Sequence, residues 1–343
     1  MKVAWLPDNL NENKSFLFFK KAFSLAGFNN ISNLEFYSNL QKTDFLVLNF
    51  YEDINKKAGV YFISFLGKIF RFFRFKFCGI KILFVLNNKI PHDNSSFWSK
   101  KMMKFLVNNS YKIICLCHDS EKVLKTLQKN ESKWNKKLIF LPHPNYIENE
   151  NQNNYFPSKF SVLFFGAIRP YKNVDILIKS FNEFSKNKDC SLIIAGRVKD
   201  LSYKNYIENL AKENPKIELK LEFIPDEEIV TLIQKSSICV FPYDNETSLN
   251  SGSVLLSSSY KRSFICPNIG TVNDFKNKNL FYSYDYNTNQ EHFEKLIQML
   301  ETAYSDFQKN PLILKEKGEN LFEYVKNEHS VQKLAEILNR ELR

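Results

Sequence analysis

Short runs of apolar residues alternate with longer stretches of helical period along most of the chain. In the first half, the apolar runs predict strands at 3–6, 45–48, 80–86, 113–116 and 138–141. The segments between them repeat their apolar residues every three or four positions and predict helices at 15–26, 60–77, 97–108 and 120–129. This alternation predicts a parallel sheet covered by helices.

The polar segment 147–154 has no periodicity and is interpreted as a linker. After it the alternation resumes, with strands predicted at 161–165, 191–195, 218–223, 238–241 and 264–266. Helices are predicted at 174–186, 203–214, 226–234, 251–259 and 290–304, and the end of the chain is amphipathic over 330–342. A chain of 343 residues also exceeds what one core usually supports.

We therefore predict an α/β fold with two Rossmann-like parallel-sheet domains facing a cleft. The first domain spans residues 1–150 and the second spans 155–325. Residues 326–343 are expected to form a C-terminal helix that packs back on the first domain. Ligands of such sheets bind at the carboxyl ends of the strands.

The composition limits the cellular compartments and the classes of binding partner that the protein is expected to have. The formal net charge is +11, which is expected for a protein with anionic partners but also results from a general bias in amino-acid composition. The placement of the charges is therefore more informative than their sum. The six cysteines form no C-x-x-C pair and no metal spacing, and no cleavable signal opens the chain. The chain contains no run of about 18 uncharged apolar residues, so no segment is predicted to span a membrane. These features predict a cytoplasmic protein without bound metal.

The most informative stretch is 162–181, in which a buried strand is followed by a charged loop and a helix. Gly166 at the end of the strand lets a ligand approach the backbone. Arg169 and Lys172 in the loop can neutralise phosphate oxygens beside a helix N-terminus, where anions are favoured. The alternative is a solvated turn whose charges have no ligand.

The motif G-x-x-R-P-Y-K in this stretch resembles the donor-binding loop of GT-B-fold glycosyltransferases of the family-4 type. The resemblance implies that Arg169 and Lys172 hold the diphosphate of a nucleotide-sugar donor. Residues 192–197, which contain Gly196, resemble the family's next strand and its end. Residues 223–243, which end at Tyr243, resemble the helix and strand that border the nucleotide in the family.

A loop of small polar residues, 244–253, then leads into the next predicted helix. The side chains and amides of Ser251, Gly252 and Ser253 are candidates to hold the sugar-phosphate, although an ordinary helix N-cap is the alternative interpretation. The chain departs from the family here, because Leu249 and Ser257 occupy the positions of its two glutamates. Glu246 is out of register. The sequence is closer to a subgroup without these glutamates, so we expect inversion at the anomeric carbon.

The first domain carries the candidate base in the segment 87–93, which resembles H-N-x-x-P-H-E/D of the same subgroup, with Asn87 in place of the first histidine. His92 and Asp93 are the candidate catalytic residues, since transfer needs a base for the acceptor proton. The alternative is that Asp93 caps the next helix and His92 is a polar loop residue. Weaker candidates are Asp8, His118 and Asp119, whereas His143 is expected to be structural.

Residues 54–92 contain no acidic side chain, and basic and aromatic residues are mixed at helical spacing over 58–78. This combination is typical of a helix that lies in the interface of an anionic membrane. A buried helix with a basic outer face is the alternative. Nucleic acid is a less suitable partner, because no recognition fold accompanies the basic patch.

Together these features predict a metal-independent hexosyltransferase without a cofactor, whose donor substrate is a nucleoside diphosphate sugar. The expected acceptor is a saccharide, including one carried on a polyprenyl diphosphate, in the synthesis of surface polysaccharide or glycan. The expected location is the inner face of the membrane, as a peripheral cytoplasmic protein. Two rival functions remain, a non-catalytic sugar-nucleotide or glycan-binding protein and a GT-B epimerase of the sugar nucleotide.

Overall fold

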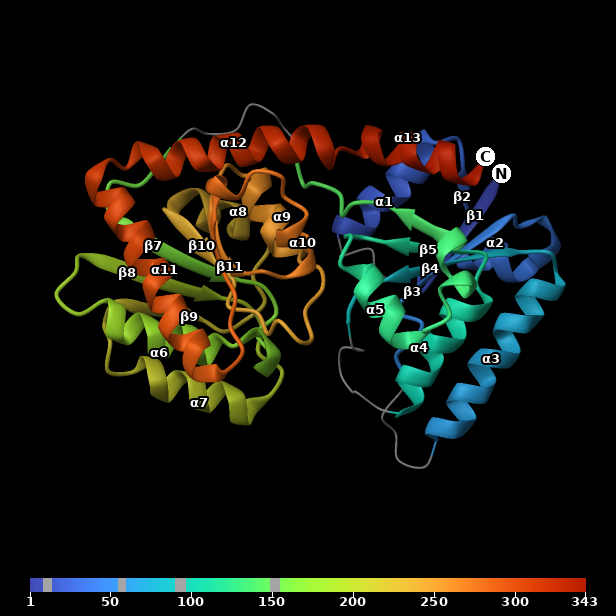
Figure 1. Ribbon diagram of the computed structural model, residues 1–343, viewed down its shortest axis with the longest axis horizontal. Helices are drawn as coiled ribbons and strands as arrows, with labels where there is room; N and C mark the ends of the chain where they lie inside the picture. The colour runs from blue at the N-terminus through green and yellow to red at the C-terminus, as the bar shows by residue number, and fades with distance from the viewer. Residues whose placement is uncertain (9–13, 55–59, 90–96, 149–154) are drawn as a thin grey trace. The chain divides into compact units, whose positions relative to one another are not determined.

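The computed structural model divides the chain into two compact units (Figure 1). The first unit contains Met1–Pro144 and His329–Arg343, and the second contains Asn145–Glu328. The first unit thus ends before the predicted boundary at residue 150, and its C-terminal part begins at 329 rather than 326. The residues that the structure describes are 1–8, 14–54, 60–89, 97–148 and 155–343.

The first unit is built on a parallel sheet with the strand order β2-β1-β3-β4-β5-β6. The central strands are almost completely buried, as expected for apolar runs that are covered on both faces. In the sheet, Leu46 of β3 pairs with Ala4 of β1 and Ile82 of β4. The strands are β1 (Lys2–Leu6), β2 (Asn29–Asn30), β3 (Phe45–Asn49), β4 (Lys81–Leu86), β5 (Lys112–Cys115) and β6 (Leu138–Phe140).

The helices of the first unit include one from the end of the chain. Helix α13 (Val331–Leu342) packs against α1 (Lys14–Leu25), and its residues Leu334 and Leu338 are completely buried in the core that also contains Trp5. The other helices are α2 (Asn33–Ser38), α3 (Tyr61–Phe77), α4 (Phe97–Asn109) and α5 (Ser120–Leu127), with short 3-10 turns η1 (Leu40–Lys42), η2 (Glu131–Lys133) and η3 (Asn135–Lys137).

The second unit has a parallel sheet with the order β12-β11-β10-β7-β8-β9. Read from β9 to β12, the order corresponds to the 3-2-1-4-5-6 arrangement of Rossmann-type sheets. Both six-stranded parallel sheets confirm the predicted α/β class. The strands are β7 (Phe160–Phe165), β8 (Cys190–Ala195), β9 (Ile217–Lys220), β10 (Ile238–Val240), β11 (Phe264–Pro267) and β12 (Tyr282–Tyr284).

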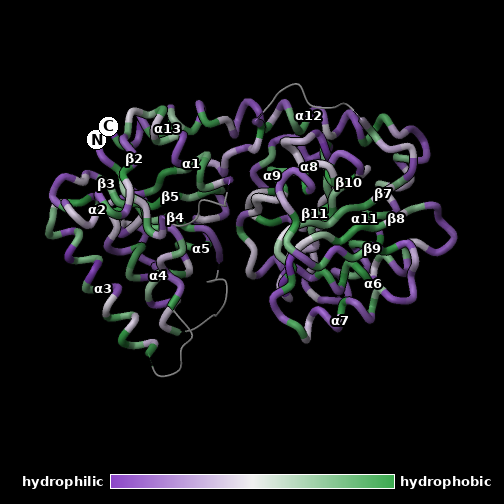
Figure 2. Tube along the Cα trace, turned by 180° about the vertical axis from the view of Figure 1, so that it is seen from behind, coloured by the Kyte–Doolittle hydropathy of each residue, from purple (hydrophilic) through white to green (hydrophobic). Residues whose placement is uncertain are grey.

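Helices cover the sheet of the second unit, and the hydropathy colouring of Figure 2 places hydrophobic residues along its strands. Helix α11 packs against α6, and α12 packs against α9. Among the described residues, no helix combines the length and the apolar character that a membrane span requires. The helices are α6 (Val174–Phe184), α7 (Leu201–Ala211), α8 (Asp226–Lys235), α9 (Gly252–Ser259), α10 (Gly270–Asn273), α11 (Asn289–Lys309) and α12 (Leu312–Glu328), with 3-10 turns η4 (Pro170–Lys172) and η5 (Lys278–Leu280).

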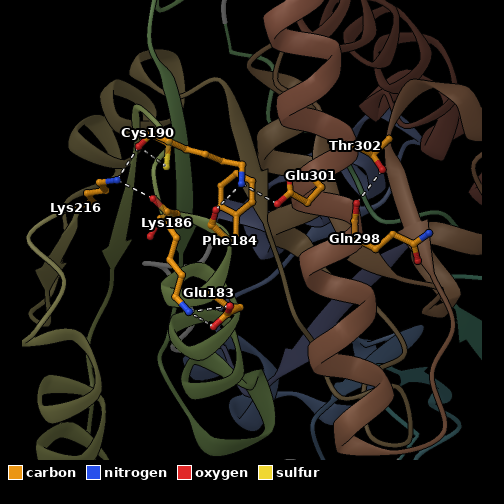
Figure 3. Close-up of polar contacts among 10 residues, drawn as sticks. Glu183, Phe184, Lys186, Cys190, Lys216, Gln298, Glu301 and Thr302 are labelled. Carbon is orange, nitrogen blue, oxygen red and sulfur yellow. Dashed lines mark hydrogen bonds and ion pairs between the residues drawn. The ribbon is translucent and has the colours of Figure 1, made fainter.

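Hydrogen bonds from lysine side chains connect the elements at the amino-terminal edge of this sheet (Figure 3). The Lys188 ammonium donates to the Phe184 carbonyl at 3.0 Å and to a Glu301 carboxylate oxygen at 2.9 Å. Lys216 donates to the carbonyls of Ser185 and Lys188, both at 2.7 Å. These contacts join the end of α6, the approach to β8 and the middle of α11. The candidate site lies at the opposite edge of the sheet, where the strands have their carboxyl ends.

Candidate functional site

The candidate site lies at the carboxyl edge of the second sheet, where the strand order reverses. Strands β7 and β10 are neighbours although they are far apart in the sequence. Gly166 directly follows β7, and Tyr243 lies three residues beyond the end of β10. Such a switch point is the place where open α/β sheets bind their ligands. The predicted donor-site residues therefore gather around the switch point of one sheet.

Two glycines bring the ends of β7 and β8 into close contact. Gly166 has φ +122° and Gly196 has φ +154°, which are conformations that side chains rarely tolerate. A Cβ on Gly196 would lie only 1.9 Å from the Gly166 carbonyl oxygen. Only hydrogen therefore fits at position 196. A Cβ on Gly166 would lie 3.4 Å from the Ser253 hydroxyl oxygen, so Ser253 of α9 approaches the backbone of this glycine.

The charged loop between β7 and α6 places one cation over an aromatic ring. Lys172 ends the 3-10 turn η4, and its ammonium lies 3.7 Å from the centre of the Tyr243 ring. Burial lowers the pKa of Lys172 to about 8, while Cys266 partly opposes this and the nearby Arg169 adds to it. Arg169 directly precedes the turn as its N-cap residue. The two predicted phosphate ligands thus lie close enough for their charges to interact.

The first turn of α9 is held by a network of hydroxyl groups. Ser251 is the N-cap residue, and its side chain accepts a hydrogen bond of 3.2 Å from the Val254 amide. The same hydroxyl donates to the Tyr243 hydroxyl at 3.2 Å, and the Ser251 amide donates to Thr271 at 3.0 Å. Ser251 is therefore buried and caps α9, as the N-cap interpretation expects.

Gly252 and Ser253 occupy a different position from Ser251. They are the first residues of α9, whose opening amides have no carbonyl partner within the helix. Both residues are partly exposed, whereas Ser251 is buried. The backbone amides of Gly252 and Ser253 at the positive end of the helix dipole can therefore receive an anion.

The loop between β10 and α9 is fixed from two sides. The Asp244 carboxylate accepts hydrogen bonds from the amides of Glu246 at 2.9 Å and Thr247 at 2.8 Å. The Tyr286 hydroxyl donates to the Tyr243 carbonyl at 3.1 Å and accepts from the Asn245 amide at 3.0 Å. This framework sets the position of Tyr243 and hence of the ring beneath Lys172.

Neither position of the family's two glutamates can supply a carboxylate in this chain. Leu249 is fully buried, and Ser257 is fully buried with its hydroxyl donating to the Val254 carbonyl at 2.9 Å. Glu246 is exposed, and its amide is part of the turn closed by Asp244. A carboxylate at this site would have to come from other residues.

Most weaker candidates of the first unit have structural contacts. Asp8 forms an ion pair with Lys20. The His118 ring is stacked on Phe140 with ring centres 4.5 Å apart. Asp119 pairs with Lys122 at 2.6 Å. The catalytic candidates His92 and Asp93 lie outside the described residues.

His143 and Asn87 also make local contacts in the first unit. His143 is buried, with its ring nitrogens near the Ser15 hydroxyl at 3.1 Å and the Pro144 carbonyl at 3.0 Å. Burial lowers the pKa of His143 to about 4. The Asn87 amide, which replaces a family histidine, donates to the Asn49 side chain at 2.6 Å. Asn87 thus joins the ends of β3 and β4.

A buried carboxyl group that the sequence does not reveal lies just beyond β3. Glu52 is 1% exposed, and its Oε2 has no hydrogen-bond partner among the described residues. Burial raises the pKa of Glu52 to about 8, with Lys68 acting against this shift. Phe50, two residues before Glu52, has φ +54°, which is unusual for a bulky residue. Because β1 and β3 form the switch point of this sheet, Glu52 lies near its ligand-binding edge.

His292 is a second residue that sequence patterns do not reveal. It lies on α11 in the second unit, and its ring is stacked on Tyr286 with centres 4.0 Å apart. Both ring nitrogens lack hydrogen-bond partners among the described residues, and burial lowers the pKa to about 4. The neutral imidazole therefore supports the tyrosine that holds the β10–α9 loop. In sequence, His292 appears only as a polar position in an amphipathic helix.

The described residues contain no group of three or more His, Cys, Asp and Glu side chains arranged to hold a metal ion. The candidate site itself consists of cations, glycines, hydroxyl groups and helix amides. This donor set is suited to an anionic ligand.

Two Rossmann-like units with these sheets define the GT-B class of folds. Residues 145–254 match the family model of glycosyl transferases group 1, and this segment contains every predicted donor-site residue. The comparison with curated protein sequences gave no significant match.

Solved structures of the same class cover the whole chain. HepE from Anabaena, in complex with UDP-glucose, matches with a TM-score of 0.72 and 12% identity over 100% of this chain and 99% of its own. Sucrose-phosphate synthase from Thermosynechococcus elongatus matches with a TM-score of 0.72 and 11% identity over 100% and 98%. At these identities the similarity establishes the fold.

A structure of S. aureus TarM has a TM-score of 0.65 and 14% identity. The match covers 87% of this chain, which spans 55% of the TarM chain.

Proposed function

We propose that this protein is a glycosyltransferase that moves a hexose from a nucleoside diphosphate sugar to a saccharide hydroxyl. The observation that carries the proposal is the gathering of Lys172, Gly166 and the first turn of α9 at the switch point of the second sheet. The family match over residues 145–254 and the UDP-glucose complex of HepE support a nucleotide-sugar donor.

In this proposal the second unit binds the donor. Arg169 and Lys172 neutralise the diphosphate, and the amides of Gly252 and Ser253 donate to its oxygens. Gly166 and Gly196 leave the backbone open to close approach, and Tyr243 supports the Lys172 ammonium from below. Because protein cations compensate the phosphate charge, the reaction requires neither a metal ion nor a cofactor.

Transfer forms one bond and breaks one bond at the sugar. The acceptor hydroxyl oxygen attacks the anomeric carbon, and the bond from that carbon to the diphosphate oxygen breaks. A base takes the hydroxyl proton while the diphosphate leaves with the bonding electron pair. We place His92 and Asp93 in the role of the base. With Leu249 and Ser257 at the family's glutamate positions, we infer that the product has the inverted anomeric configuration.

On the acceptor side, we propose a saccharide carried on a polyprenyl diphosphate, used in the synthesis of surface polysaccharide or glycan. Such an acceptor is presented at the inner membrane face, which agrees with a peripheral cytoplasmic enzyme. The basic and aromatic character of the first unit supports this part of the proposal.

One observation favours a second function, a sugar-nucleotide-binding protein without transferase activity. The missing carboxylates at Leu249 and Ser257 leave the donor site without the family's acid groups. The third possibility, a sugar-nucleotide epimerase, needs no acceptor. These functions differ in what they do to a labelled donor, so one experiment distinguishes them.

The test is incubation of the protein with radiolabelled UDP-, GDP-, CDP- and ADP-hexoses and a membrane extract. A transferase moves label into a lipid or saccharide product, an epimerase returns an altered sugar nucleotide, and a binding protein leaves the donor unchanged. The anomeric configuration of the product, read by NMR, tests inversion. Binding without turnover of any donor would contradict the proposal.

Matched variants connect this activity to the site. R169A and K172A should each weaken binding of the active nucleoside diphosphate by about 1.5–3 kcal/mol in calorimetry, the range for a hydrogen bond to a charged group. The control is K186A, because Lys186 is exposed and pairs with Glu183 at the opposite edge of the sheet (Figure 3). Unchanged affinity in both site variants would show that the diphosphate binds elsewhere.

A further inference from the structure

Helix α3 exposes an apolar stripe along its whole length. Six of its large apolar side chains are between 37% and 88% exposed. At 3.6 residues per turn, these positions fall within a sector of about 100° on the helix surface. They are Phe62, Ile63, Leu66, Phe70, Phe73 and Phe77. An ordinary surface helix turns such a stripe inward, so this orientation calls for a partner.

The opposite face of α3 attaches the helix to the first unit. Phe72 and Phe75 are buried, and their rings lie 5.0 Å from Phe105 and 5.3 Å from Phe36. Two residues at one edge of the stripe also contact α4, because the Phe62 ring lies 5.2 Å from Trp98 and the Phe73 ring lies 5.7 Å from Phe105. The alternative of a buried helix with a purely basic outer face does not describe α3, because much of its outer face is aromatic. Figure 2 shows hydrophobic and hydrophilic residues alternating along it.

Lys68 belongs to this inner face, although it is one of the basic residues of the segment 58–78. Its ammonium donates to the carbonyls of Tyr51 at 2.8 Å and Asp53 at 2.7 Å, and burial lowers its pKa. Lys68 therefore anchors α3 and does not contribute to an outer charge.

Exposed basic residues flank the apolar stripe. At 100° per residue, Arg74 and Arg71 follow its one edge, and Lys76 lies beyond the other. Helix α4 adds Phe97, which is 62% exposed, with the Lys101 ammonium 4.2 Å from the centre of its ring. Because residues 54–92 contain no acidic side chain, no carboxylate in this segment offsets these charges.

We infer that α3 and the start of α4 form a docking surface for an anionic lipid bilayer. The aromatic and aliphatic side chains enter the headgroup boundary, while the arginines and lysines meet lipid phosphates. Charge complementarity selects this partner, since a second copy of the same chain would bring like charges together. The role of the surface in reaching a lipid-linked acceptor rests on the proposed function. The docking itself does not.

The experiment measures co-sedimentation with vesicles of phosphatidylcholine and phosphatidylglycerol, compared with phosphatidylcholine alone. We expect binding to the mixed vesicles that decreases with added salt, because salt screens the charges. Each basic residue near an anionic surface changes partitioning about fivefold, so reversing two charges in R71E/R74E should lower it by at least about 25-fold. The variant F70S/F77S removes the apolar contribution and should also lower binding.

Control substitutions come from the same unit. Leu34 of α2 is 85% exposed, so L34S removes an exposed apolar side chain outside the stripe. Lys21 and Lys42 are exposed, so K21E/K42E makes the same change in net charge as R71E/R74E. Both controls should bind vesicles like the unchanged protein. Thermal unfolding of every variant verifies the fold, and all four changes involve exposed residues.

Two outcomes would overturn the inference. One is equal sedimentation with neutral and mixed vesicles, or none with either. The other is a dimer in sedimentation velocity that F70S/F77S dissociates, without vesicle binding, which would identify the stripe as a self-association surface. Calorimetric binding of the nucleoside diphosphate separates this result from failure of the proposed function, because donor binding does not need a membrane.

Discussion

Lys172 combines a positive charge with a position that is partly withdrawn from water. Burial lowers its pKa to about 8, and the Tyr243 ring faces its ammonium at 3.7 Å. Below about pH 8 the free protein carries this charge, and above it the charge is progressively lost. A bound diphosphate favours the protonated form. Binding at higher pH must therefore include uptake of a proton.

This linkage predicts that the affinity for the nucleoside diphosphate falls as pH rises from about 7 to about 9, approaching a tenfold loss per pH unit above the pKa. The measurement is calorimetry at several pH values. K172R keeps its charge over this range, so its affinity should be nearly independent of pH, even if its different shape weakens binding. K186A should follow the unchanged protein. A flat profile for the unchanged protein would contradict the assignment of Lys172 to the diphosphate.

The site residues that could be predicted from the sequence share one property, which is that the pattern of the neighbouring residues indicates their position in the fold. Gly166, Arg169 and Lys172 stand between an apolar run and an amphipathic segment, and that order alone predicts a strand end, a loop and a helix start. Glu52 and His292 are different, because their burial depends on residues distant in the sequence. No local sequence pattern predicts that the Glu52 Oε2 atom and the two ring nitrogens of His292 lack hydrogen-bond partners among the described residues.

At the scale of elements, the central strands were predictable because they are apolar and buried on both faces. The two-residue β2 and the short α2 carry too few positions for a periodicity. Strand β9 ends at Lys220, before the predicted end at 223, because Glu222 and Phe223 are exposed beyond it. Helix α12 was not predicted, since a glycine in its interior resembles a helix breaker.

That glycine, Gly318, has a packing role in α12. A Cβ at this position would lie 2.1 Å from the Lys261 carbonyl oxygen at the end of α9. The backbone cannot move away easily, because Arg262 is buried and its guanidinium donates to several carbonyl oxygens. Close contact between α12 and α9 therefore requires a residue without a side chain.

We predict that G318A lowers the free energy of unfolding by about 1–3 kcal/mol, as overpacking does. Helix propensity alone would change it by about 1 kcal/mol in the opposite direction. The control is G67A in α3, where no atom lies within 4 Å of the added Cβ, so propensity should prevail and stability should rise. Denaturant unfolding without vesicles measures both. A stabilising G318A would mean that α12 is not held against α9 in solution.

At the scale of the whole molecule, the path of the chain makes the first unit depend on residues that follow the second unit in the sequence. The chain leaves this unit at Pro144, forms the second unit, and returns at His329. Helix α13 then contributes five apolar residues to the first core, namely Val331, Leu334, Ala335, Leu338 and Leu342. The first unit can therefore complete its core only after the second has been made.

Leu338 tests this dependence, because it is fully buried in the first core although it follows the second unit in the sequence. L338A should lower the stability of the first unit by about 2–5 kcal/mol, the range for a buried leucine truncated to alanine. Hydrogen exchange should then show faster exchange at the amides of β1 and β3, with β7 and β8 retaining their protection. The reciprocal variant is L296A in α11, a fully buried residue of the second unit, which should produce the opposite pattern. If L338A weakened protection equally in both sheets, the two cores would unfold as one, and α13 would stabilise the molecule as a whole rather than the first unit.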